Sequence, residues 1–177
     1  NANSYVSGSG AQKLEQYAAF TAEVNLITPK KQKFEDKGFF YTRFISSSVF
    51  GVHQALTSSG DYTWASDDLP NFQVYVVRDQ EESDTAKFVL KNLDGTVNLE
   101  TSFYNEIYSN KNWNLAVRLK PDTYPYAGNV VTSSNSNYVL EFYGVTHAFN
   151  DVETEFLLTA SLNNTSGSAY LSNPKRF

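Results

Sequence analysis

YSNKNWNLAVRLKP, from Tyr108 to Pro121, is the stretch of sequence that decides the fold. Within it, apolar residues occupy every second position from Trp113 to Leu119. A period of two places successive side chains on opposite faces of a β-strand, whereas an amphipathic helix repeats its apolar positions every three to four residues. Because proline cannot donate the next ladder hydrogen bond, we expect the strand to end at Pro121. The stretch therefore predicts a strand with one apolar face packed on a core.

Strand-like segments recur along the rest of the chain, most of them with the same alternation. The expected strands cover residues 20–26, 39–45, 49–56, 72–78, 86–90, 97–103, 138–145, 156–162 and 169–171. A break or bulge is expected over residues 46–48. The sequence Asn-Leu-Asp-Gly at 92–95 predicts a tight hairpin turn, because Asp-Gly accepts the positive φ angles that such a turn requires. Many short strands at this spacing predict an all-β fold with two antiparallel sheets packed as a β-sandwich.

Composition excludes several classes of protein. The net charge is −5 and no stripe of lysine or arginine stands out, so we expect no nucleic-acid partner. The chain contains no cysteine, which excludes disulfides and thiolate metal sites. No apolar run approaches the length needed to cross a bilayer, so we expect no membrane insertion.

The domain organisation predicted from the sequence is simple. Residues 1–19 begin with a Ser-, Gly- and Asn-rich segment and are expected to form an N-terminal tail or linker. Residues 20–177 are expected to form a single β-sandwich domain. The chain lacks methionine and ends directly after a strand-like segment, so we expect a fragment or processed product of a longer chain.

Three segments carry a resemblance to a known family. They are 112–118 (NWNLAVR), 138–144 (YVLEFYG) and 169–173 (AYLSN). In this order they resemble the concanavalin A-like jelly rolls of the laminin-G type, in which a strand led by Trp is followed by strands with Tyr and Gly at similar places. The resemblance implies a jelly-roll sandwich over roughly residues 20–177. Such domains also occur in virion and tail proteins of tailed phages, which implies a location in a virion or on an extracellular surface.

The best candidate for catalysis is the acidic segment DVETE, residues 151–155. A glycoside hydrolase needs two carboxylates that flank the scissile bond in one groove. Alternation puts Asp151, Glu153 and Glu155 on one face of a strand, and we expect this to be the solvated outer face, because the inner face begins at Phe156. We therefore expect no enzymatic activity.

No cofactor is expected, although calcium is a candidate ligand. His53 and His147 are the only histidines and belong to no cluster with metal-ligand spacing, which argues against zinc. Carboxylates at loop ends suit a hard cation such as calcium. The candidate ligands are Asp61, Asp67 and Asp68, with Asp122 or Asp151 as further possibilities, and a solvated acidic turn is the alternative.

Aromatic residues in two expected loops are the candidate ligand-binding residues. Tyr62 and Trp64 lie in one loop, and Tyr124 and Tyr126 flank a proline in the other. A sugar ring could stack on such side chains while carboxylates or amides bind its hydroxyl groups. The same rings could instead cover an open end of the core or contact a neighbouring subunit, and we favour this second interpretation.

Two functions follow as hypotheses. The first is a non-catalytic structural or interaction module of a virion or surface assembly, with other protein subunits as partners. The second is a glycan-binding adhesion module of the lectin kind, in which calcium could assist. A glycoside hydrolase is a distant third.

Overall fold

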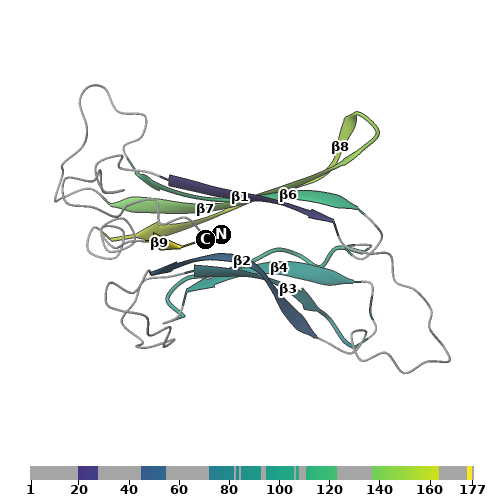
Figure 1. Ribbon diagram of the computed structural model, residues 1–177, viewed down its shortest axis with the longest axis horizontal. Helices are drawn as coiled ribbons and strands as arrows, with labels where there is room; N and C mark the ends of the chain where they lie inside the picture. Colours follow the sequence, from purple (N-terminus) through teal and green to yellow (C-terminus); the bar gives the residue numbers. More distant parts are fainter. Residues whose placement is uncertain are drawn as a thin grey trace.

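The computed structural model describes residues 20–27, 45–54, 72–81, 83, 85–92, 95–105, 107, 111–122, 137–163 and 175–176. These residues form two antiparallel sheets that face each other as two layers (Figure 1). They contain no helix, and hence none long and apolar enough to span a membrane. The predicted all-β, two-sheet antiparallel sandwich is confirmed.

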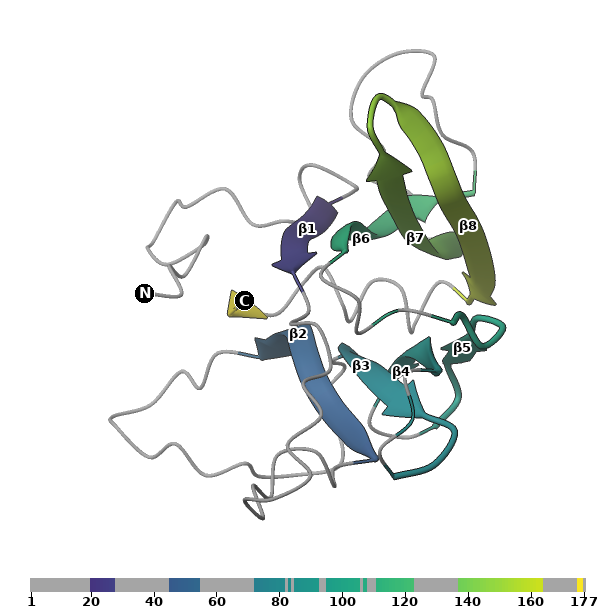
Figure 2. The ribbon, with the colours of Figure 1, turned by 90° about the vertical axis from the view of Figure 1, so that its right-hand side faces the viewer.

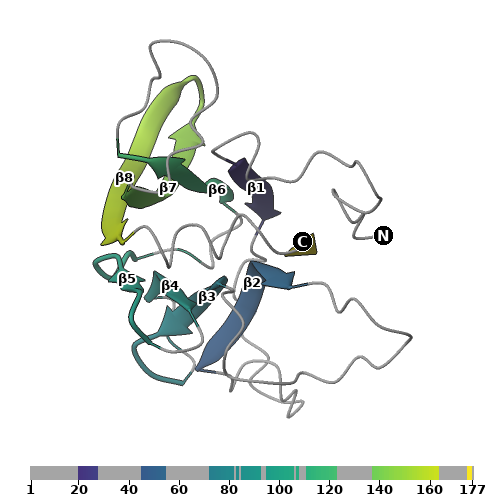
Figure 3. The ribbon, with the colours of Figure 1, turned by 90° about the vertical axis from the view of Figure 1, so that its left-hand side faces the viewer.

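The first sheet has four strands in the order β1-β6-β7-β8. These strands are β1 (Phe20–Ile27), β6 (Asn112–Pro121), β7 (Tyr138–Ala148) and β8 (Asp151–Leu162). The second sheet has the order β5-β4-β3-β2-β9. It consists of β2 (Ser46–Gln54), β3 (Phe72–Arg78), β4 (Ala86–Asn92), β5 (Asn98–Glu100) and β9 (Lys175–Arg176). Figures 2 and 3 show the two sheets from their sides, with β8 at one margin of the first sheet.

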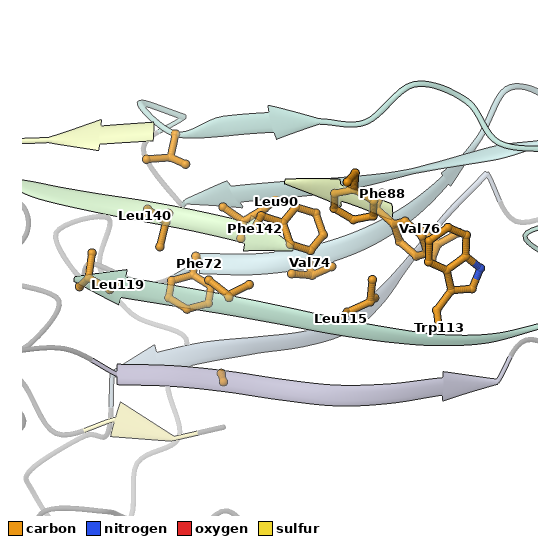
Figure 4. Packing of buried hydrophobic residues seen from close by; sticks show 14 of the residues in the cluster. Phe72, Val74, Val76, Phe88, Leu90, Trp113, Leu115, Leu119, Leu140 and Phe142 are labelled. Carbon is orange, nitrogen blue, oxygen red and sulfur yellow. The ribbon is translucent and has the colours of Figure 1, made fainter. Parts of the chain in front are cut away.

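The strand predicted from the alternation between Trp113 and Leu119 is β6, and it ends at Pro121 as predicted. Its alternate residues from Trp113 to Leu119 are buried, and they face the apolar side of the second sheet. Figure 4 shows Trp113 beside Phe88 and Val76 at one end of the core, and Leu119 near Phe72 and Leu140 at the other. Burying one large apolar side chain, such as Val or Leu, stabilises a fold by about 1.5–3 kcal/mol. The buried residues of β6 therefore contribute strongly to the stability of the domain.

An aromatic cluster closes one end of the core. Trp113 meets Phe88 edge to face, with ring centroids 5.0 Å apart and an interplanar angle of 69°. Phe156 from β8 meets Phe142 edge to face at 5.1 Å, and it stacks on Phe88 at 5.9 Å. Edge-to-face and stacked pairs each contribute about 0.5–1.5 kcal/mol beyond their buried area. The cluster thus joins β4 of one sheet to β6, β7 and β8 of the other.

The backbone departs from regular strand geometry in the connection after β4 and within β2. For the predicted turn at 92–95, Gly95 has the expected positive φ, +72°, and its N–H donates a hydrogen bond of 3.3 Å to Asn92 O, while residues 93–94 lie outside the described residues. In β2, residues 46–48 belong to the strand rather than breaking it, and the register shifts between Ser48 and Phe50. Of the predicted strand over residues 39–45, only Ile45 is described, and it precedes β2. The predicted strand over residues 169–171 lies outside the described residues.

Candidate functional site

Most of the residues predicted to bind a ligand or metal belong to connections outside the described part of the chain. The two further calcium candidates are described: Asp122 is exposed just after β6, and Asp151 is exposed at the start of β8. Tyr62, Trp64, Asp61, Asp67 and Asp68 belong to the connection between β2 and β3. Tyr124 and Tyr126 belong to the connection between β6 and β7, whose base is closed by a hydrogen bond from Asp122 N to Asn137 O of 3.0 Å. Both sets of residues therefore stay predictions.

The bases of these two connections lie at the same end of the sandwich. Phe72 begins β3, Leu119 lies near the end of β6, and Leu140 lies near the start of β7. Figure 4 shows these three side chains together at one end of the core. The fold thus brings together the ends of two segments that are about fifty residues apart in the chain, which the sequence alone did not predict.

The outer face of the first sheet carries a polar row beside an aromatic side chain. Tyr143 of β7 lies between Ala116 of β6 and Leu157 of β8 in the strand register. Its hydroxyl is hydrogen-bonded to Glu155. The pKa of Tyr143 is raised above its ordinary value, mainly by desolvation and also by the nearby Glu155 carboxylate. On the neighbouring strands, Asn114 Nδ2 donates a hydrogen bond of 2.7 Å to Glu23 Oε1. This face can therefore offer a phenol, amides and carboxylates to a ligand.

A buried carboxylate lies on the same face. Glu141 Oε2 accepts hydrogen bonds from Arg118 Nε at 2.6 Å and Nη2 at 2.5 Å, while Glu141 Oε1 lies 2.7 Å from Lys120 Nζ. Burial by itself raises the pKa of Glu141, but the hydrogen bonds and charges of Lys120 and Arg118 outweigh it, so the pKa is lowered overall. Both carboxylate oxygens are occupied by cations, so we assign this carboxylate a structural role.

The acidic segment at 151–155 is exposed, as predicted, but it does not form one row. The β7–β8 register passes from Thr146 opposite Thr154 to His147 opposite Val152, so Glu153 is an extra residue at a bulge. Alternation therefore fails across the bulge, and the prediction that Asp151, Glu153 and Glu155 share a face is wrong. Separate partners bind two of them, since Glu153 forms an ion pair with Lys111 and Glu155 bonds to Tyr143.

The described residues contain no group of three or more His, Asp or Glu side chains that could hold a metal ion. His147 is exposed on β7, near the end of the strand. His53 pairs through its backbone with Arg176 of β9.

The β7–β8 hairpin presents apolar side chains that the sequence analysis did not single out. Its two-residue connection is Phe149-Asn150, between Ala148 and Asp151. Phe149 is fully exposed and has a φ of +57°. Val152 beside it is 54 % exposed, and Leu157 farther along β8 is 58 % exposed. Figure 1 shows the end of this hairpin, at the upper right, curving away from the second sheet.

The sequence of the β7–β8 connection, Phe149-Asn150, does not match the residue pairs typical of tight hairpin turns. Tight hairpins favour Asn-Gly or Asp-Gly, which adopt positive φ at low cost. Phe149 holds a left-handed backbone that costs a bulky residue about 1–2 kcal/mol. Backbone strain of this kind is concentrated at functional sites, so the hairpin end is the strongest candidate interaction site in the described residues.

Comparisons of the chain with family models, curated proteins and solved structures found no match.

Proposed function

We propose that this domain is a non-catalytic interaction module that contacts other protein chains of a virion or surface assembly. The observation that carries the proposal is Phe149, a fully exposed aromatic side chain in a left-handed backbone at the end of the β7–β8 hairpin. A solvated phenylalanine adds nothing to the core, and its backbone conformation costs stability. Contact with a partner would account for both features, because large aromatic side chains are enriched at the centres of protein interfaces.

The surroundings of Phe149 support the same proposal. Val152 is half-exposed two residues beyond the turn, so the hairpin end presents two apolar side chains. Glu153 and Lys111 form an ion pair beside them. An apolar centre with a charged rim is the usual anatomy of a protein interface. The sandwich architecture is compatible with the concanavalin A-like resemblance, which stays part of the proposal.

Photo-crosslinking tests this proposal. A p-benzoylphenylalanine in place of Phe149, irradiated in the native assembly, is expected to give a covalent product with one defined protein chain. The matched control is the same substitution at Phe103, which is also exposed but lies near the edge of the other sheet. The centroid of the Phe103 ring is 5.1 Å from Lys87 Nζ. Yields at position 149 no higher than at position 103 would contradict the proposal.

A second candidate function, binding of glycans, is favoured by the outer face of the first sheet. This face presents the ring of Tyr143 together with two carboxylates and one amide. The carboxylates belong to Glu155 and Glu23, and the amide belongs to Asn114. Such groups suit the faces and hydroxyls of a sugar. Glycan-array binding, measured with and without a chelator, tests this candidate and the calcium it could use.

The glycan-array variants are Tyr143→Ala for the sheet face, and Trp64→Ala and Tyr126→Ala for the predicted loop residues. Binding by the unmodified chain that is lost in any of the three would favour the glycan-binding function. The absence of binding, together with specific crosslinks from position 149, would favour the interaction module.

A further inference from the structure

The outer edge of the first sheet is formed by β8, the longest strand in the described part of the chain, with 12 residues. Its inner edge pairs with β7, and no described strand pairs with its other edge (Figure 2). The second sheet ends in β5 and β9, which have three and two residues. A long edge strand offers a row of backbone N–H and C=O groups to another chain, whereas very short edge strands do not.

Natural edge strands are usually protected against pairing, and the sequence of β8 carries few of the protective features. Lysine, proline and bulges are the common protective features. The segment from Thr154 to Leu162 reads TEFLLTASL and contains neither lysine nor proline. The bulge at Glu153 lies outside it, so these nine consecutive residues keep a regular strand register. Leu157, at the fourth position of this segment, is 58 % exposed.

The sequence of β8 is complementary to a second copy of itself in the antiparallel direction. A two-fold axis at Leu157 would place that residue against its own copy and Glu155 opposite Thr159. On the inner face, Phe156 would lie opposite Leu158, extending the apolar layer between the sheets. A parallel arrangement in register would instead put Glu155 beside Glu155 of the other copy, and like charges at such positions are destabilising.

We propose that two copies of this chain pair antiparallel through β8, centred on Leu157, so that their four-stranded sheets join into one continuous sheet. The proposal rests on the proposed function as an interaction module, and it names a second copy of this chain as one partner. The hairpin end with Phe149 lies outside the paired segment, so it stays available for other chains of the assembly.

Charge substitutions at Thr159 test the register. Thr159→Lys would face Glu155 of the other copy twice in each dimer, and Thr159→Glu would place like charges there. Thr159 is exposed, but it lies opposite Glu141 in the β7–β8 register, so circular dichroism must show that both variants keep the native fold. We expect Thr159→Glu to raise the dimer dissociation constant about tenfold and Thr159→Lys to lower it, as measured by analytical ultracentrifugation. The matched controls are Thr21→Glu and Thr21→Lys on β1, an exposed position of the opposite edge, which should leave the constant unchanged.

Because the chain has no cysteine, a single introduced thiol gives an independent test. Opposed residues of an antiparallel pair have Cα atoms about 4.5–5.5 Å apart, which a disulfide can bridge. Leu157→Cys is therefore expected to form a covalent dimer on mild oxidation, and Thr21→Cys is not. A purely monomeric chain at about 100 μM, a dimer insensitive to charge at position 159, or crosslinking at Thr21→Cys alone would overturn the pairing. Specific crosslinks from position 149 in a monomeric chain would refute β8 pairing while leaving the proposed function intact.

Discussion

Gly144 and Phe156 lie directly opposite each other in the β7–β8 pair, and the ring of Phe156 occupies the space that a side chain at position 144 would need. A Cβ built on Gly144 would overlap Phe156 Cε1 and Cζ and would lie 2.9 Å from Leu115 Cδ2. The glycine thus lets a ring from the edge strand reach the aromatic cluster around Phe88 and Phe142. Close packing at this point ties β8 to the core.

Gly144→Ala is expected to destabilise the domain by about 1–3 kcal/mol, because the ring of Phe156 must leave its position between other rings. Urea unfolding followed by circular dichroism measures the change. The double variant with Phe156→Leu removes the clash, so its cost should be less than the sum of the two single substitutions. Additive costs would show that the two residues do not compete for space.

Gly95 provides the opposite case, in which space is free and conformation is restricted. Its φ is +72°, and nothing lies within 4 Å of a Cβ built there. Gly95→Ala should therefore cost about 1–2 kcal/mol through its left-handed backbone alone. Gly95→Asn should cost less, since Asn tolerates this conformation. Equal costs for the two variants, measured by thermal unfolding, would contradict this explanation.

The sequence predicted the elements that depend on local pattern. The alternation in β6 identified the residues from Trp113 to Leu119 that face the core, and the Asp-Gly turn identified Gly95. Features that depend on pairing between strands were not predictable. The bulge at Glu153 is created by the β7–β8 register, and the contact of Glu141 with Arg118 depends on which residues of β6 and β7 are opposite.

The candidate site was predicted less well than the fold, because it depends on how strands and turns are placed in three dimensions. The sequence predicted a site on aromatic residues of two loops, because loops often carry function, and those loops lie outside the described residues. Phe149 carries the strongest structural signal, yet a Phe-Asn connection matches no tight-turn pattern. The exposure of Phe149 and its positive φ depend on how the β7–β8 hairpin is placed relative to the core, which the local sequence does not encode.

Glu141 predicts a dependence of stability on pH. Its pKa is lowered below the ordinary value of 4.5 in the folded chain, so its stabilising effect is complete above that value and is lost as the pH falls through the folded-state pKa. Glu141→Gln should lower the free energy of unfolding by about 1–2 kcal/mol at pH 7, since Arg118 and Lys120 lose their shared partner. The deficit should shrink on acidification below pH 4.5.

Urea unfolding of both chains between pH 7 and pH 3 measures the effect of Glu141. Glu100→Gln is the matched control, because Glu100 also has a lowered pKa, through hydrogen bonds from Lys87 and Asn98, but is exposed. Its effect should be smaller than that of Glu141→Gln, as for most surface ion pairs. A deficit for Glu141→Gln that is constant across this range would rule out the carboxylate charge as the cause.

Phe149 is expected to lower the stability of the folded chain while contributing to contact with a partner chain. Phe149→Asn should raise the free energy of unfolding by about 0.5–1 kcal/mol, because asparagine adopts a φ of +57° at lower cost and the exposed ring contributes nothing to the core. Phe149→Ala keeps most of the backbone cost, so its stability should stay close to that of the unmodified chain. Both variants remove the ring, and both should lose assembly with the partner identified by crosslinking. Thermal unfolding combined with a reconstitution assay separates the two effects, and an Asn variant that is stabilised yet assembles normally would show that the ring makes no contact that matters.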